Sequence, residues 1–165
     1  MSTLTKFKEL KKQQAAEERE SQRRYKEEKE YHAKERRQIY NTFVNLIKPF
    51  HNQTINKHKI VLKFHDHTNS IEMFIDGQLY TTFIAETEYH HCNCSECADG
   101  QTGHKGSYSH TLNTFVTNRS GERKAGPYFC WYDAKDEDGF AGEFDRFIEK
   151  YDSDLRWNKL SLADE

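Results

Sequence analysis

The clearest indication of the fold is the sequence of residues 60–85, which reads IVLKFHDHTNSIEMFIDGQLYTTFIA. Apolar side chains recur at every second position in residues 60–64 and again in 71–75, the period of a strand with one buried face. Between these segments, residues 67–70 have the composition of a turn. Asp76-Gly77 is a strong signal for a two-residue hairpin that leads into residues 79–85. This stretch therefore predicts a meander of antiparallel strands.

The flanking sequence supplies further strands and two helical segments. Residues 112–117 and 128–132 predict two more strands, joined by a Gly- and Lys-rich loop at 118–127. The spacing of the aromatic residues in 140–155 predicts an amphipathic helix with Asp138 as its N-cap. The expected fold class is α+β: an antiparallel sheet of about five strands covered by helices, with a long charged helix at the N-terminus.

The N-terminal helix is predicted from residues 5–38, which are rich in Lys, Arg, Glu and Gln and lack Pro and Gly. Apolar residues are nearly absent between Leu10 and Ile39. A helix that is polar on all sides is either a solvated arm or a helix that binds a partner. From Ile39 an apolar face appears, and Pro49 favours a helix end near Lys48. We expect a charged helical arm at 1–38 and an α+β body at 39–165.

The charge distribution separates these parts further. Residues 1–48 carry 13 basic and 8 acidic side chains, whereas residues 49–165 carry 12 and 19. A basic arm can bind an anionic partner or fold back on its own acidic body. The interspersed glutamates repel phosphate and weaken a nucleic-acid interpretation. The candidate partner-binding residues are Arg19, Arg23, Arg24, Tyr25, Lys29, Tyr31, Arg36 and Arg37.

The metal candidate is the loop expected at residues 90–110, which contains three of the four cysteines and four of the nine histidines. Thiolate and imidazole are preferred zinc ligands, and several nearby thiolates favour a closed structural site over a catalytic one. We expect one structural zinc, with His90 and His91 as further possible ligands, or else a flexible loop of thiols. The candidate ligands are Cys92, Cys94, Cys97, His104 and His110. Cys130 fits a core thiol or a distant ligand.

A metal-dependent hydrolase or nuclease would need a different site, built on His65 and His67 with His90 and His91. A polar hairpin end is the simpler interpretation of the first pair. The sequence has no Gly-rich phosphate loop, no G-x-S-x-G elbow and no H-E-x-x-H helix, so no catalytic residue is predicted.

The sequence therefore favours a non-enzymatic zinc-binding protein that docks into a larger assembly through its charged helix. The assembly could be a protein complex, a viral or phage particle, or a nucleoprotein. The first alternative is a nucleic-acid-binding protein that uses the basic arm and the zinc loop. No small-molecule substrate is indicated.

The compartment is inferred from hydropathy. No apolar run approaches the ~20 residues of a membrane span, and the first 20 residues are too polar for a signal peptide. We therefore expect a protein of the cytoplasm or another reducing compartment that is not secreted and has no membrane partner. Thiols in such a compartment are reduced or metal-bound.

Overall fold

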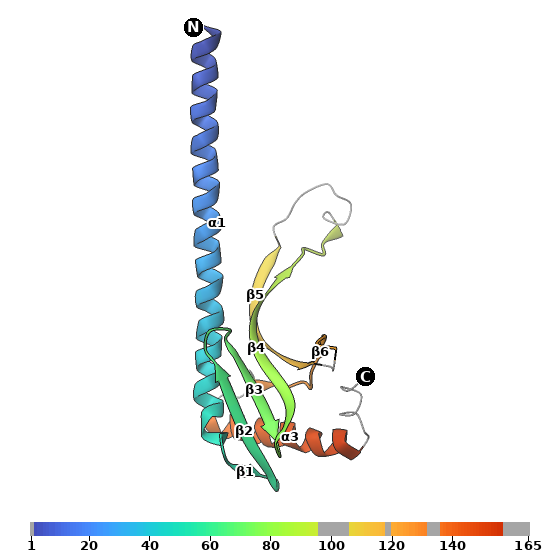
Figure 1. Cartoon of the computed structure of the whole chain (residues 1–165). Coiled ribbons are helices and arrows are strands. Elements are labelled where there is room, and N and C mark those ends of the chain that lie inside the picture. Colours follow the sequence, from blue (N-terminus) through green and yellow to red (C-terminus); the bar gives the residue numbers. More distant parts are fainter. Residues whose placement is uncertain (1, 96–105, 118–119, 132–135, 157–165) are drawn as a thin grey trace. The chain divides into compact units, whose positions relative to one another are not determined.

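The computed structural model describes residues 2–95, 106–117, 120–131 and 136–156. The described chain forms an α+β fold with one six-stranded antiparallel sheet (Figure 1). The chain divides into two compact units, residues 1–35 and residues 36–165.

The elements follow one another along the chain in a simple order. Helix α1 spans Thr3–Ile47, and a 3₁₀ turn follows at Lys48–Phe50. The strands are β1 Thr54–Ile55, β2 His58–His65, β3 Ser70–Ile75, β4 Gln78–His90, β5 Ser107–Thr117 and β6 Arg123–Ala125. Helix α3 spans Glu137–Arg156. Each strand pairs with its sequence neighbour, so the sheet is a meander in the order β1 to β6.

The first unit is a helix without a core of its own. Residues 2–31 are exposed apart from the half-buried Glu20. The helix holds itself together with ion pairs one turn apart, Glu20–Arg23 at 2.6 Å and Arg23–Glu27 at 2.7 Å. Exposed pairs of this kind add little to stability, so the helix depends mainly on the propensity of its residues.

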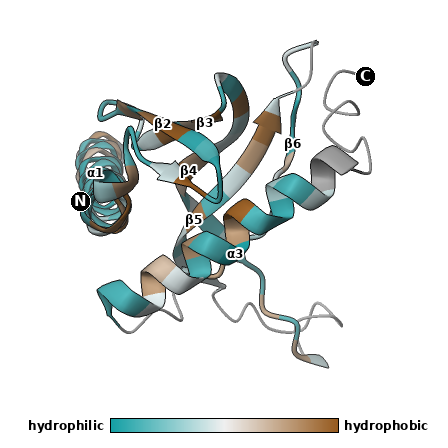
Figure 2. Cartoon of the chain, turned by 90° about the horizontal axis from the view of Figure 1, so that it is seen from below, coloured by the Kyte–Doolittle hydropathy of each residue, from teal (hydrophilic) through white to brown (hydrophobic). Residues whose placement is uncertain are grey.

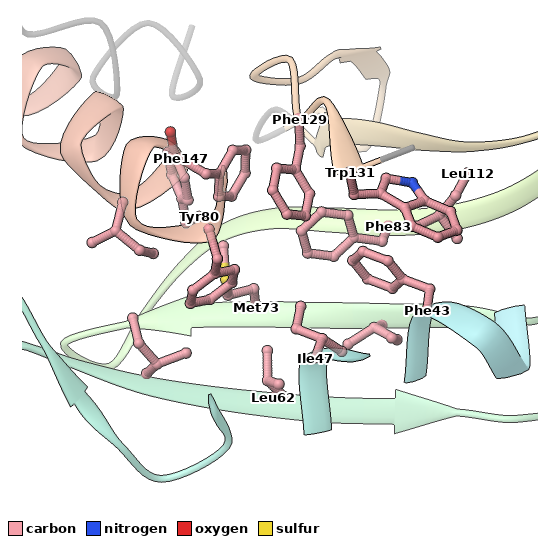
Figure 3. Close-up of a cluster of buried hydrophobic side chains, with 14 of the residues drawn as sticks. Phe43, Ile47, Leu62, Met73, Tyr80, Phe83, Leu112, Phe129, Trp131 and Phe147 are labelled. Carbon is pink, nitrogen blue, oxygen red and sulfur yellow. The ribbon is translucent and has the colours of Figure 1, made fainter. Parts of the chain in front are cut away.

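The second unit has a core rich in aromatic residues. Figure 2 shows α3 lying across the sheet, and Figure 3 shows the side chains that meet there. Phe43 is fully buried and lies 4.9 Å from Phe83 and 5.1 Å from Trp131 between ring centroids. Ile47 and Phe147 are buried in the same cluster. The C-terminal end of α1 thus belongs to the core of the body, as the apolar face beginning at Ile39 predicts.

Two details of the predicted elements are wrong. Residues 128–130 are not in a strand, and the last strand is β6, inside the expected loop. The ladder with β5 closes at Gly126, whose N–H donates to the Thr114 carbonyl at 2.9 Å, and Pro127 has no N–H to continue it. The alternating aromatic residues in this segment reflect burial rather than a strand, since the side chains of Phe129 and Trp131 are only 7% and 6% exposed.

The N-cap of α3 also lies two residues earlier than expected. Asp136, not Asp138, accepts the Gly139 N–H through its carboxylate at 2.7 Å. Asp138 lies inside the first turn, where its negative charge complements the helix dipole.

Candidate functional site

The candidate metal centre lies beyond the paired ends of β4 and β5, which extend as a curved hairpin (Figure 1). The ladder continues to Tyr89 opposite Tyr108 and to His90 opposite Ser107. The connecting segment is therefore 91–106, shorter than the loop expected at 90–110. Both ends of this segment start from adjacent, hydrogen-bonded strands. The strands already hold the two ends together, which lowers the entropy cost of forming a metal site in the segment.

Tyr89 closes the base of that segment. Its ring lies 5.0 Å from the ring of Tyr108, and the ring of His91 meets it edge-on at 4.7 Å. The Tyr89 hydroxyl accepts the Gly106 N–H at 3.1 Å. A Cβ at position 106 would lie 2.4 Å from the His90 carbonyl oxygen and 2.4 Å from the Tyr89 ring, so only glycine permits this approach.

The thiols follow directly after β4. Cys92 and Cys94 are both half-buried. Cys97 and His104 lie outside the described residues. Within the described ranges, no three His, Cys, Asp or Glu side chains are arranged to hold a metal ion. The donor chemistry of Cys92 and Cys94 fits zinc, and any complete shell has to draw on the remaining segment.

The two strand histidines lie on opposite faces of the hairpin. His110 pairs with Thr87, and His90 pairs with Ser107, three positions away. Because side chains alternate between faces, His110 shares a face with Thr87 and Tyr89, whereas His90 projects from the other side. His90 is hydrogen-bonded there to Ser109 at 2.6 Å. The strands therefore do not bring these two histidines to one ion.

His110 is also set back from the thiols. Its partner Thr87 precedes Cys92 by five residues, a span of about 16 Å in extended chain. The Thr87 hydroxyl accepts a hydrogen bond from Arg36 at 2.7 Å, so this face of the ladder is in contact with the part of α1 that belongs to the body. His104 and His91 are nearer to the cysteines along the chain than His110 is.

The four histidines of the hydrolase alternative are not gathered by the sheet. His65 pairs with Ser70, and Ser70 pairs with Ile84, which precedes His90 by six residues, about 20 Å of strand. His65 is hydrogen-bonded to Glu72, and both are partly exposed. The segment is a hairpin end with its own polar partners.

That hairpin end is tied to α1. The Tyr40 hydroxyl donates to the Asp66 carboxylate at 2.8 Å, and Arg37 donates to the Asp66 carbonyl at 2.6 Å. Burial raises the pKa of Tyr40, and the hydrogen bond to Asp66 raises it further. Arg37 also donates to the Asn69 side chain at 3.1 Å. Asp66 therefore has a structural role.

The predicted partner-binding residues fall into two groups. Arg36 and Arg37 belong to the body and are engaged within it by the contacts above. The others lie on the exposed helix: Arg19, Arg23, Arg24, Tyr25, Lys29 and Tyr31. Arg23 and Arg24 both donate to Glu20, and the hydrogen bond from Arg23 is the main reason that the pKa of Glu20 falls to about 2.

One polar centre has no signal in the sequence. His58 at the start of β2 contacts Asp76 through Nδ1 at 2.6 Å and Asp152 of α3 through Nε2 at 2.5 Å. The hydrogen bond to Asp76 is the largest cause of the raised pKa of His58. These residues are 18 and 94 positions apart, so no local pattern could have paired them.

Comparisons with protein families, with curated proteins and with solved structures find no match to this chain. Within the described residues, no helix has the length and apolarity needed to cross a membrane.

Proposed function

We propose that this chain is a non-enzymatic zinc-binding interaction protein whose helical arm docks into a larger protein assembly. The observation that carries the proposal is the exposure of residues 2–31, a helix of about eight turns with only Glu20 half-buried. A helix of this length with no buried face gains no packing energy of its own, so docking against a partner surface would stabilise it.

The part of the arm that suits a partner is the segment around Tyr25. Tyr25 is 68% exposed and Tyr31 is 55% exposed, and tyrosine is favoured at protein interfaces because its large ring can be buried while its hydroxyl stays bonded. Arg19 and Lys29 form no hydrogen bond or ion pair with other described residues, so their charges are available. Basic and acidic side chains alternate here, and this favours a protein partner over a nucleic acid.

The zinc part of the proposal rests on the thiols beyond β4. We assign Cys92, Cys94, Cys97 and His104 as the four ligands, since all belong to the segment whose ends Tyr89 and Gly106 hold together. Bound zinc would cross-link this segment and stabilise it. The thiolate ligands of the zinc require a reducing compartment. His110 is the fourth ligand only if the chain beyond β4 turns back toward the middle of the ladder.

Elemental analysis of the purified chain tests the zinc site. We expect about one zinc per chain, the content of a single tetrahedral site. Cys94→Ser should lower that content and cost several kcal/mol of stability, because metal binding is coupled to folding. Cys130→Ser removes a thiol outside the segment and should keep the zinc. A full chain without stoichiometric zinc would contradict the assignment.

A second pair of variants identifies the histidine ligand. His104→Ala should release zinc, whereas His110→Ala should retain it because His110 lies opposite Thr87, away from the thiols. The reverse result would move the site toward the strands and refute the proposed ligand set.

Sedimentation tests the arm. The full chain should show association that depends on concentration, or should retain a protein of defined mass in native mass spectrometry. Tyr25→Ala combined with Lys29→Ala should weaken either behaviour without changing the melting temperature. A single monomeric species at every concentration, with no retained protein, would count against docking. Retained nucleic acid that is released at high salt would support the nucleic-acid alternative instead.

A further inference from the structure

The first turns of α1, residues 3–12, differ in their side chains from the proposed docking segment around Tyr25. The helix is formed and capped here, since the Ser2 hydroxyl accepts the Thr5 N–H at 3.3 Å and the Ser2 carbonyl accepts the Lys6 N–H at 3.1 Å. A helix that is already formed avoids the ordering cost that a disordered segment meets on binding.

An exposed apolar stripe runs along these turns. Leu4, Phe7 and Leu10 are 63%, 54% and 56% exposed. Their three-residue spacing places them within about 120° of the helix circumference. Among the large aliphatic and phenylalanine side chains of the described residues, only Leu79, at 41%, is also exposed. The stripe is therefore a concentrated apolar surface, distinct from the scattered exposed tyrosines.

The basic excess of the arm lies in the same turns. Residues 3–12 carry four lysines and one glutamate, whereas residues 13–35 carry six basic and seven acidic side chains. The net charge of the arm is thus concentrated on its first turns and is slightly negative beyond them.

The lysines border the apolar stripe. At about 100° per residue, Lys6 and Lys8 project on the two sides of Phe7, and Glu9 points about 160° away from it. The ammonium of Lys11 lies 5.1 Å from the Phe7 ring centroid, so its stem runs along the stripe. Lysines in this position can bury their stems while their charges reach upward to anions.

We propose that residues 3–12 bind the anionic surface of a lipid bilayer. A bilayer interface offers an apolar layer for Leu4, Phe7 and Leu10 and negative headgroups on both flanks for Lys6 and Lys8. Nucleic acid would satisfy the lysines but would leave the apolar stripe in water. Glu9, the one acidic side chain, faces away from the membrane in this arrangement. The surface lies outside the Tyr25 segment, so it goes beyond the proposed function, and it replaces the expectation of no membrane partner.

Co-sedimentation of the full chain with phospholipid vesicles tests the inference. Vesicles of phosphatidylcholine that contain phosphatidylserine should carry the protein down, and vesicles of phosphatidylcholine alone should carry much less. Lys6→Gln combined with Lys8→Gln should lower the partition coefficient about 25-fold, since each lysine near an anionic surface is worth about fivefold. Phe7→Ser should lower it about tenfold.

Matched variants elsewhere in the chain provide the controls. Lys26→Gln combined with Lys34→Gln removes the same charge from the arm, and Leu79→Ser removes an exposed apolar side chain from the body; both should bind like the wild type. All these positions are exposed, so the variants should fold. Absence of binding to the phosphatidylserine vesicles would overturn the proposal. An equal loss in the control variants would do so too, because it would mean that no defined surface is involved.

Discussion

At the scale of single residues, the hairpin end depends on a contact that only glycine allows. Gly106 approaches the His90 carbonyl and the Tyr89 ring at distances that exclude a Cβ. The cysteine motif points to this region, but the requirement for glycine at position 106 comes from the register of β4 with β5.

Gly106→Ala should therefore destabilise the protein by about 1–3 kcal/mol, the usual cost of forcing an atom into filled space. Gly142→Ala is the control, because a Cβ there meets nothing within 4 Å and lies inside α3. It should stabilise the protein by about 0.5–1 kcal/mol, the advantage of alanine over glycine in a helix. Denaturant titration of both variants measures the difference, and similar values for the two would show that the close approach is not maintained.

His58 is the residue whose protonation most clearly makes the stability of the protein depend on pH. It touches two carboxylates, and its side chain is 15% exposed. Its Nδ1 faces Asp76, its Nε2 faces Asp152, and its ring lies edge-on to Tyr151 at 5.2 Å. Hydrogen bonding to Asp76 raises the pKa of His58 and lowers the pKa of Asp76.

These shifts define a window of stability. The stabilisation from His58 is complete below its ordinary pKa of 6.5 and is lost as the pH rises through the raised value. The stabilisation from Asp76 is complete above its ordinary pKa of 3.8 and is lost as the pH falls through the lowered value. Both contributions are therefore present between pH 3.8 and 6.5.

The pH dependence of the unfolding free energy measures this contact. The wild type should lose stability above pH 6.5 relative to His58→Gln, which has no charge to lose. His67→Gln, at an exposed position in the β2–β3 turn, should keep the wild-type profile. A His58→Gln profile parallel to the wild type would mean that the imidazole does not carry the effect.

At the scale of elements, α1 is one continuous helix with two environments. Residues 2–31 are exposed except for Glu20, whereas Tyr40, Phe43 and Ile47 are buried. The change follows the sequence pattern, since the apolar face begins at Ile39.

Phe43→Ala should cost about 3–5 kcal/mol, because it removes a fully buried ring that contacts Phe83, Phe129, Trp131 and Phe140. Tyr25→Ala should change stability by less than about 0.5 kcal/mol, as expected for a residue that is 68% exposed. Chemical denaturation of the two variants provides the comparison. Equal losses would show that the exposed part of the helix is packed as firmly as its C-terminal end.

At the scale of the whole molecule, the boundary between the units falls at residue 35. Arg36 and Arg37, which the charge pattern assigns to the arm, are hydrogen-bonded to Thr87 of β4 and to Asp66 in the β2–β3 turn. The body therefore begins just before the apolar face of α1.

A chain that lacks residues 2–35 should keep a cooperative unfolding transition close to that of the full protein. A chain that lacks residues 2–47 should lose it, because Tyr40, Phe43 and Ile47 leave a large part of the core open. Calorimetry of the two truncations decides the point. Loss of cooperativity in the shorter deletion would show that the first unit contributes to the stability of the body.

The sequence by itself determined the α+β class, the meander of β2 to β4, the charged helix and the amphipathic α3. These features follow from the spacing of apolar residues and from turn residues, both of which act over a few positions in the chain. The sequence also singled out Cys92 and Cys94, but not how far the β4–β5 ladder extends toward them. Only the tertiary structure decided that ladder, the burial of Phe129 outside any strand, and the meeting of His58 with Asp76 and Asp152. Such contacts join residues far apart in the chain, and their partners are set by packing and register, which no local pattern encodes.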